Sequence, residues 1–160
     1  MKIDSSLQLS KNFNLNELIK SDTALRKGIN NSPSNVVIVN LTALVKNVLQ
    51  PIRDYYNKPV KINSGYRSPE LNALIGGSKT SDHCLGYAAD IEIPTVSNPE
   101  LAIWIINNLK FTQVILEFYT QGNPNSGWVH VSFNPSNLKC QSLTAVKENN
   151  MIVYKQGLIV

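Results

Sequence analysis

The chain has 160 residues, of which 42% are hydrophobic and 16% are charged. This length suits one domain with its own core, and the composition excludes a disordered or acidic solvating chain. The net charge of +4 is scattered without basic runs or interleaved aromatic residues, so we expect no nucleic-acid partner. No stretch approaches the roughly 18 consecutive apolar residues of a membrane span, and we expect a monomer.

The first residues contain no apolar segment of the kind that a secretory signal peptide needs. We therefore expect the protein to be made and kept in a cytoplasm. Two cysteines cannot define a disulfide framework, so we expect Cys84 and Cys140 to be free thiols.

The first third of the chain is predicted to be helical after a polar arm over residues 1–12. A capping-box pattern predicts a short helix over 14–20, and a serine cap predicts a second short turn over 21–25. Apolar residues at three- and four-residue intervals predict a long helix over 36–56. Pro51 lies inside that pattern and should kink the helix or loosen one turn.

A short strand is predicted over residues 60–64, where apolar and polar side chains alternate. Gly65 then turns the chain, and we expect this turn to leave Tyr66 and Arg67 exposed at the end of the strand. A proline at the first helical position predicts a helix over 69–75, which two glycines end.

The remainder alternates strands with one helix. Strands are predicted over 87–93, 113–118 and 128–133, and a helix capped by Asn98 with Pro99 at its first position is predicted between the first two. Residues 142–154 alternate about an Asn-Asn turn, which predicts a C-terminal β-hairpin. The fold class is therefore α+β, with a small, mostly antiparallel sheet flanked by helices.

The candidate site rests on the two histidines of the chain. His83 and Asp90 lie seven positions apart with Gly86 between them, and His130 lies in the predicted strand 128–133. Two imidazoles and one carboxylate leave a fourth zinc position open for water, as in catalytic zinc sites. Either residue type alone has a common structural role; the set of three favours a metal site.

Three motifs in this order resemble the zinc D-alanyl-D-alanine carboxypeptidase family: Ser64-Gly65-Tyr66-Arg67, Ser81-x-His83-x-x-Gly86-x-Ala88-x-Asp90 and Trp128-x-His130. The family contains D,D-carboxypeptidases, dipeptidases and phage endolysins, and shares its fold with the hedgehog signalling domain. The resemblance is closest to its small single-domain subgroup in bacteria and phages. It covers residues 13–133 of a single domain over 1–160, and leaves 134–160 as a hairpin extension.

The resemblance implies a role for each matching residue. Zn²⁺ is the expected cofactor, and its implied ligands are His83, Asp90 and His130. Arg67 matches the arginine that faces the tetrahedral oxyanion, and Ser81 matches a serine near the terminal carboxylate of the substrate. Capping a loop is an equally ordinary role for that serine. Two aromatic residues, Tyr66 and Trp128, are predicted to form walls of the cleft, although core packing would explain them nearly as well.

The general base departs from the family pattern. Several members carry Glu or Asp three residues before the last histidine ligand, where this chain has Gly127. We predict that Glu117 serves instead, because a carboxylate within one water of the metal can take the proton of the nucleophile. Asp82 is a weaker candidate. Cys84 could bind zinc as a thiolate, but beside His83 it would point to another side of an extended backbone.

The resemblance therefore implies a zinc peptidase that hydrolyses peptidoglycan stem peptides, either a D,D-carboxypeptidase or an endopeptidase of the endolysin type. A phage lytic enzyme waiting in a host cytoplasm would agree with the missing leader. Two alternatives stay open. One is a metal-bearing but catalytically silent binding module, and the other is a phage or cell-surface structural component whose hairpin docks to a partner.

Overall fold

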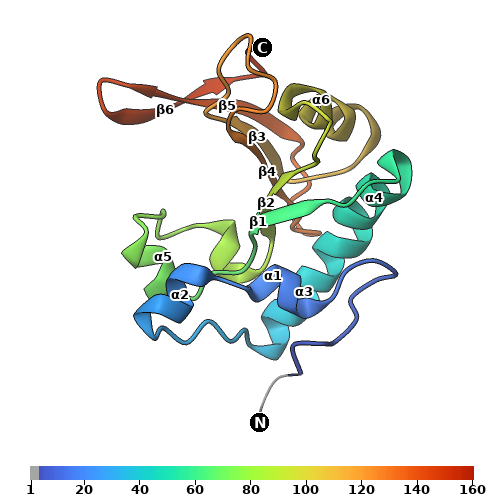
Figure 1. Ribbon diagram of the computed structural model, residues 1–160, viewed down its shortest axis with the longest axis vertical. Helices are drawn as coiled ribbons and strands as arrows, with labels where there is room; N and C mark the ends of the chain where they lie inside the picture. The colour runs from blue at the N-terminus through green and yellow to red at the C-terminus, as the bar shows by residue number, and fades with distance from the viewer. Residues whose placement is uncertain (1–3) are drawn as a thin grey trace.

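The computed structural model describes residues 4–160 and confirms the α+β class. Its strands are β1 (Lys61–Ser64), β2 (Ala88–Glu92), β3 (Gln113–Glu117), β4 (Trp128–Ser132), β5 (Gln141–Glu148) and β6 (Met151–Gln156). Its helices are α1 (Leu15–Ile19), α2 (Asp22–Lys27), α3 (Asn35–Leu44), α4 (Gln50–Tyr56), α5 (Pro69–Leu74) and α6 (Asn98–Asn108), with a π-helical segment η1 (Val45–Leu49) and a 3₁₀ turn η2 (Asp82–Leu85). Figure 1 shows their arrangement.

The strands form one six-stranded sheet in the order β1-β2-β4-β3-β5-β6. Every neighbouring pair is antiparallel except β3 with β5, so the mostly antiparallel sheet is confirmed. The predicted terminal hairpin is also present, as β5 and β6. Its turn residues Asn149 and Asn150 have φ of 49° and 62°, as a two-residue hairpin turn requires. Because β5 pairs with β3, the hairpin extends the same sheet.

Pro51 loosens the long helix as predicted. Residues 35–56 are continuously helical, and η1 ends at Leu49, two residues before the proline. The amide of Gln50 donates to the carbonyl of Val45, five residues earlier. Proline has no N–H, and its ring collides with the carbonyl four residues before it in a regular α-helix. A widened π turn removes that collision, which explains its place in the chain.

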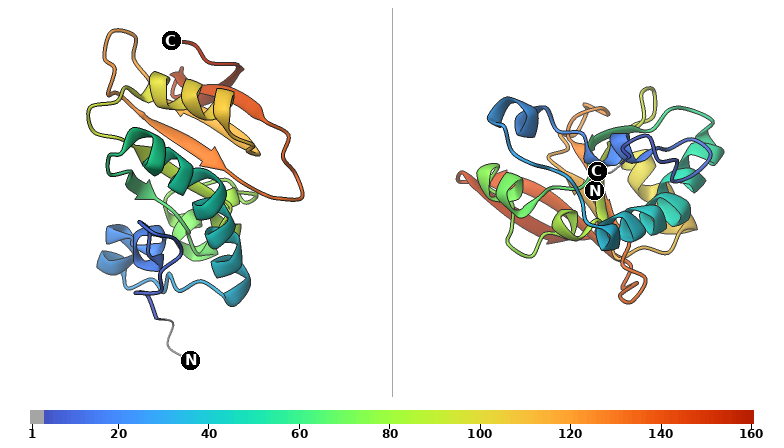
Figure 2. Two further views of the ribbon diagram at one scale, coloured as in Figure 1. Left: turned by 90° about the vertical axis from the view of Figure 1, so that its right-hand side faces the viewer. Right: turned by 90° about the horizontal axis from the view of Figure 1, so that it is seen from below.

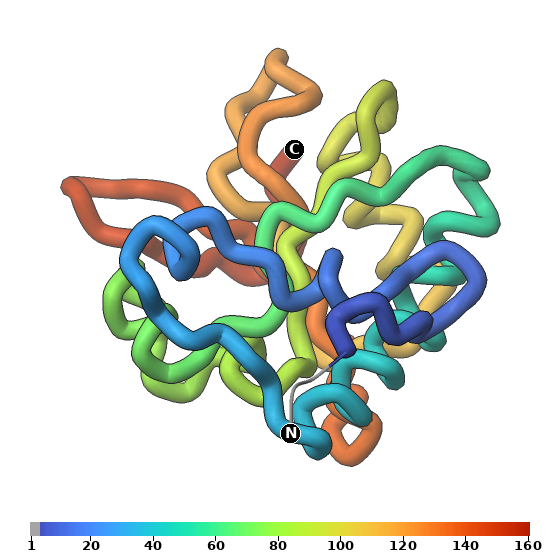
Figure 3. Tube along the Cα trace, turned by 60° about the horizontal axis from the view of Figure 1, so that its bottom comes forward, coloured from blue at the N-terminus to red at the C-terminus, as the bar shows by residue number. Residues whose placement is uncertain are grey.

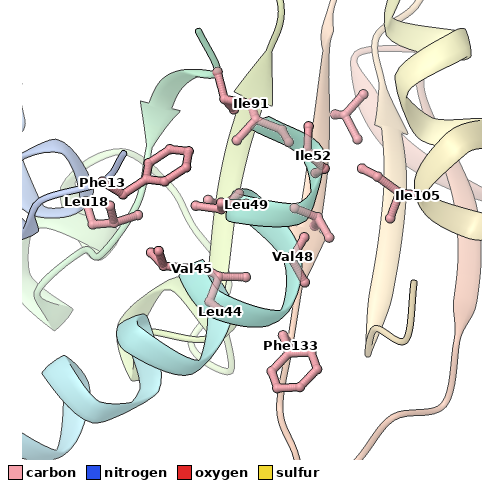
Figure 4. Packing of buried hydrophobic residues seen from close by; sticks show 14 of the residues in the cluster. Phe13, Leu18, Leu44, Val45, Val48, Leu49, Ile52, Ile91, Ile105 and Phe133 are labelled. Atoms are coloured by element: carbon pink, nitrogen blue, oxygen red, sulfur yellow. The ribbon is translucent and has the colours of Figure 1, made fainter. Parts of the chain in front are cut away.

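The same helical stretch, Asn35–Tyr56, is long and apolar enough to cross a membrane when judged by length and composition alone. In this fold its apolar stripe is buried in the core, where six residues have no exposed surface: Leu41, Leu44, Val45, Val48, Leu49 and Ile52. That burial on one face is typical of the core helix of a globular domain. Figure 4 shows part of this stripe packed against the sheet.

The sheet has two different faces. One face carries the core residues Ala89, Ile91, Val114, Leu116, Val129 and Val131, which pack with α3, η1, α4 and α6. Figure 2 shows these helices on that side of the strands. Because side chains alternate along a strand, the residues between them, including Asp90 and His130, project from the opposite face. The candidate site therefore lies on the face away from the main core.

Two local predictions were wrong. Ser97, not Asn98, caps α6, and Asn98 is the first helical residue. The buried side-chain amide of Asn98 donates to the carbonyls of Ser126 and Gly127. Tyr66 is not exposed but lies in the core at 7% exposure.

The reason for the burial of Tyr66 is the approach of α1 to the turn. A Cβ at Gly65 would overlap the carbonyl group of Leu18, so only glycine lets the two backbones meet. The amide of Tyr66 donates to the same Leu18 carbonyl at 2.7 Å. The helix thus covers the turn after β1, and the side chain of Arg67 is only 14% exposed.

Candidate metal centre

The three predicted ligands meet at one point. Nε2 of His83 lies 3.3 Å from Oδ1 of Asp90, and Nδ1 of His130 lies 3.0 Å from the same oxygen. The two ring nitrogens are 3.2 Å apart. All three residues are buried, at 2%, 7% and 8% exposure. Within residues 4–160 this is the one cluster of His, Cys, Asp or Glu side chains arranged to hold a metal ion.

Strand pairing and a 3₁₀ turn bring these side chains together. Asp90 on β2 is the direct cross-strand partner of His130 on β4, so their side chains project from the same face. His83 comes from η2, whose N-cap Ser81 accepts a hydrogen bond from the amide of His83. Gly86 ends the turn with φ of 76° and reverses the chain into β2, as its place between the ligands suggested.

The orientation of the His83 ring suits metal binding. Its Nδ1 lies 2.7 Å from the carbonyl oxygen of Gly65. A carbonyl only accepts, so Nδ1 carries the proton and the lone pair of Nε2 points into the ligand cluster. Metal-ligating histidines commonly donate their second ring nitrogen to a carbonyl in this way.

The geometry fits zinc. Ligand atoms that surround a tetrahedral zinc ion at bond lengths of about 2.0–2.1 Å lie roughly 3.3–3.4 Å from one another. The three separations of 3.0–3.3 Å in this cluster are close to that value. The donor set of two imidazoles and one carboxylate is one that zinc prefers, and it leaves one tetrahedral position open.

Burial and neighbouring charges hold two of the three candidate ligands, Asp90 and His83, in the forms that bind metal. Burial opposes ionisation of Asp90, but the two adjacent imidazoles outweigh it and hold the pKa of this carboxyl below its ordinary value. Burial lowers the pKa of His83, which keeps it neutral. For His130, the hydrogen bond and charge of Asp90 outweigh burial and raise the pKa, so this imidazole would release a proton on binding metal. A carboxylate and a neutral imidazole are the species that ligate zinc.

Arg67 is bound tightly beside the cluster. Its Nη2 lies 3.3 Å from Oδ2 of Asp90, the oxygen that does not face the histidines. Its Nε donates to Ser64 Oγ and its Nη1 donates to Oδ1 of Asn72. Each guanidinium nitrogen therefore has a protein partner, and the arginine orients the Asp90 carboxylate. Its predicted contact with an oxyanion stays a prediction.

Glu117 is the carboxylate next to the cluster. It lies at the end of β3, and its Oε1 is 4.0 Å from Nδ1 of His130. Its side chain is 17% exposed. Burial, with the Asp90 charge adding to it, raises the pKa of Glu117 to about 7. A carboxyl in this position can both accept and return a proton near neutral pH.

Gly127 has no room for the acidic side chain that the motif resemblance led us to expect at this position. Its φ is +66°, and a Cβ there would overlap the carbonyl oxygen of Glu117 and lie 2.8 Å from the carbonyl carbon of Phe118. The position is filled by the backbone at the end of β3. An acidic group near the ligands must therefore come from another strand, and Glu117 is directly opposite Trp128.

The predicted substrate-binding residues lie in different surroundings. Ser81 is half-buried and caps η2, so its ordinary structural role is present. Tyr66 belongs to the core cluster. Trp128 is half-buried beside Phe118, with ring centroids 5.3 Å apart. Its indole Nε1 is buried without a hydrogen-bond partner among the described residues.

The weaker candidates lie outside the cluster. Asp82 is in η2, next to His83, and is half-buried, but it contributes no atom to the three-ligand group. Cys84 is likewise absent from that group and is a free, half-buried thiol. Cys140 is also free, as expected.

Two asparagines support the site without having been predicted. Asn72 is 3% exposed; it accepts from Arg67 and donates to the carbonyl of Ser78. Asn31 donates to the carbonyl of Tyr66 and accepts from the amide of Ser68, so it holds both ends of the segment that contains Arg67. Their only sequence signal was an asparagine in a helix or loop, where solvent exposure is the usual expectation.

One comparison with known proteins bears on this site. A family model described as Peptidase M15 matches residues 11–132, well over half of the chain and all three ligands. No curated protein matches the chain.

Proposed function

The chain belongs to the peptidase M15 family, a family of zinc metallopeptidases, and we propose that it is a zinc-dependent peptidase that hydrolyses peptidoglycan stem peptides. The observation that carries this proposal is the joint position of the ligand cluster and Glu117. Three ligand atoms lie within 3.3 Å of one another, and Glu117 Oε1 lies 4.0 Å from one of them. A site that only held a structural metal would not need an open position and a carboxylate beside it.

Zinc bound by His83, Asp90 and His130 would lower the pKa of its water towards neutrality and polarise the scissile carbonyl. Glu117 takes the proton from the attacking water and returns it to the leaving amine, so no covalent intermediate is required. Each proton taken is given back within one turnover. Glu117 therefore ends the cycle as it began, as a carboxylate.

Arg67 has two parts in this proposal. Its charge beside Asp90 fixes the carboxylate that would bind the metal. The same fixed positive charge lies close to where negative charge develops on the carbonyl oxygen, and a preorganised guanidinium stabilises such charge at little reorganisation cost. Ser64 and Asn72 keep the guanidinium in place through hydrogen bonds.

The stem-peptide substrate and the two reaction types rest on the motif resemblance. We include both a D,D-carboxypeptidase and an endopeptidase of the endolysin type, and a phage-encoded enzyme made in a host cytoplasm agrees with either. The two reactions differ in the fragment released, a terminal D-alanine or a larger peptide.

The test is mass spectrometry of purified muropeptides incubated with zinc-loaded protein. We expect a zinc-dependent product, absent after treatment with a chelator and restored by added zinc. The mass lost identifies the bond and so separates carboxypeptidase from endopeptidase. A full set of intact muropeptides after incubation with protein of verified zinc content would overturn the proposal in favour of a silent binding module.

A further inference from the structure

The C-terminal hairpin continues the face that carries the metal centre. Glu117 is paired with Trp128 on β4 and with Ala145 on β5, and Ala145 is paired in turn with Tyr154 on β6. The four residues form one row across four adjacent strands. Side chains in such a row project from the same face of a sheet. Trp128 is two residues from His130, so this is also the face of the metal ligands.

Ala145 is the small member of the row. Neighbouring strands lie about 4.8 Å apart, which puts the backbones of Glu117 and Tyr154 roughly 10 Å from each other. The methyl group of Ala145 between them leaves that space to the longer side chains on either side. Ala145 has no exposed surface, so its neighbours cover it.

The outer part of the hairpin is open to solvent. Tyr154 is 54% exposed, and its neighbour two positions earlier, Ile152, is 55% exposed. The hairpin projects on the same side of the sheet as α5, the helix whose Asn72 holds Arg67, as Figures 1 and 3 show. Partial burial and the charges of Glu117 and Asp90 raise the pKa of Tyr154, as expected for a phenol on the same face as these carboxylates.

We infer that β6 forms the wall of the substrate cleft beyond Glu117 and that Tyr154 contacts the bound peptide there. The inference rests on the proposed function and adds a substrate-binding residue to it. Tyr154 lies outside residues 11–132, the part of the chain that the family model matches. It is therefore a candidate for setting which peptides this particular enzyme accepts.

The chemistry of Tyr154 suits a short peptide rich in alanine. Its ring offers an exposed apolar surface against which methyl side chains can pack. Its hydroxyl can donate a hydrogen bond to a peptide carbonyl or carboxylate at the end of the ring. Ile152 extends the apolar surface along the same face of β6, because it is two residues away.

The experiment compares Tyr154→Ala and Tyr154→Phe with the wild type, using a synthetic stem pentapeptide and zinc-loaded protein. Tyr55→Ala is the matched control, because Tyr55 is also an exposed tyrosine, at 62%, but belongs to α4 on the other side of the sheet. Kd is measured by calorimetry in a Glu117→Gln background, and KM and kcat are measured in the native background. Zinc content and thermal unfolding are recorded for each variant.

We expect Tyr154→Ala to raise Kd and KM about tenfold, which is the effect of losing one aromatic contact and one hydrogen bond. The value of kcat should change much less. Tyr154→Phe should give Kd and KM values between those of the wild type and those of Tyr154→Ala. Tyr55→Ala should give the same values as the wild type. Unchanged Kd and KM in Tyr154→Ala would overturn the inference.

Failure of the proposed function gives a different result. If the wild type cleaves nothing, the Kd comparison alone decides the role of Tyr154. If the pentapeptide does not bind to the Glu117→Gln protein either, the wall assignment is overturned too.

Discussion

Gly127, immediately before β4, lies directly against the backbone of Glu117 at the end of β3. A Cβ on Gly127 would overlap the carbonyl oxygen of Glu117. The backbone of β3 thus lies where the motif resemblance would place an acidic side chain, and the same strand end carries the carboxylate of Glu117. Residue 127 therefore has no room for a side chain, and Glu117 is the acidic residue beside the candidate ligands at this strand end.

Removal of either histidine ligand should remove the metal. We expect His83→Ala and His130→Ala to contain far less than the zinc content of the wild type after identical loading, because two ligands hold zinc much less tightly than three. Mass-spectrometric metal analysis measures this directly. Zinc at 100 times its Kd stabilises a protein by about 2.7 kcal/mol, so the melting temperature of the wild type should also fall on chelation.

For the ligand variants, chelation should leave the melting temperature unchanged. Full zinc content in both histidine variants would contradict the ligand assignment.

Glu117→Gln should keep the metal and lose the reaction. The glutamine side chain has the same shape as glutamate but cannot accept and return a proton. We therefore expect the rate of hydrolysis to fall by about 10²–10⁴-fold. Zinc content should equal that of the wild type, because Glu117 is not among the three ligands. The control is Glu92→Gln, a half-buried glutamate of the same sheet that pairs with Lys61. An unchanged rate would place the general base elsewhere, with Asp82 the next residue to replace.

Gly127→Ala should destabilise the fold more than Gly122→Ala does. Both glycines have positive φ, +66° and +83°, but a Cβ at Gly122 meets nothing within 4 Å. The strained backbone alone should cost about 1–2 kcal/mol at either position. Overlap with β3 adds about 1–3 kcal/mol at Gly127.

Denaturant unfolding of the two variants measures the difference. Equal losses of stability would show that the β3 backbone can shift away from residue 127 at little cost. An acidic side chain could then be accommodated there.

Arg67→Ala should weaken zinc binding although Arg67 is not a ligand. Loss of an outer partner of a metal ligand typically costs about 10–100-fold in metal affinity, and Arg67 is the partner of Asp90 Oδ2. Arg67→Lys should not restore it, because one ammonium cannot reach Ser64, Asn72 and Asp90 in the fixed geometry of a guanidinium. Competition with a chromogenic chelator measures the affinity, with Arg26→Ala on α2 as the exposed control.

A different outcome would separate the two roles of Arg67. Unchanged zinc affinity together with a large loss of kcat would assign the arginine to the oxyanion rather than to the position of Asp90.

The sequence by itself determined the local elements and the candidate ligands. Capping residues, the spacing of apolar residues and the Asn-Asn turn act within a few positions, so they predict the first helices, the Pro51 distortion and the hairpin without any knowledge of the fold. The three motifs likewise named His83, Asp90 and His130, because a metal site draws on few residue types.

Only the tertiary structure decided what surrounds those ligands. The burial of Tyr66 depends on α1, which lies far away in the sequence. The bonding of Arg67 depends on Asp90, which β2 brings alongside it, as well as on the nearer Asn72. The parallel pairing of β3 with β5 puts Ala145 and Tyr154 in the row of Glu117, and no local signal specifies that register. Such pairings are set by side chains that meet across the sheet after the chain has closed on itself.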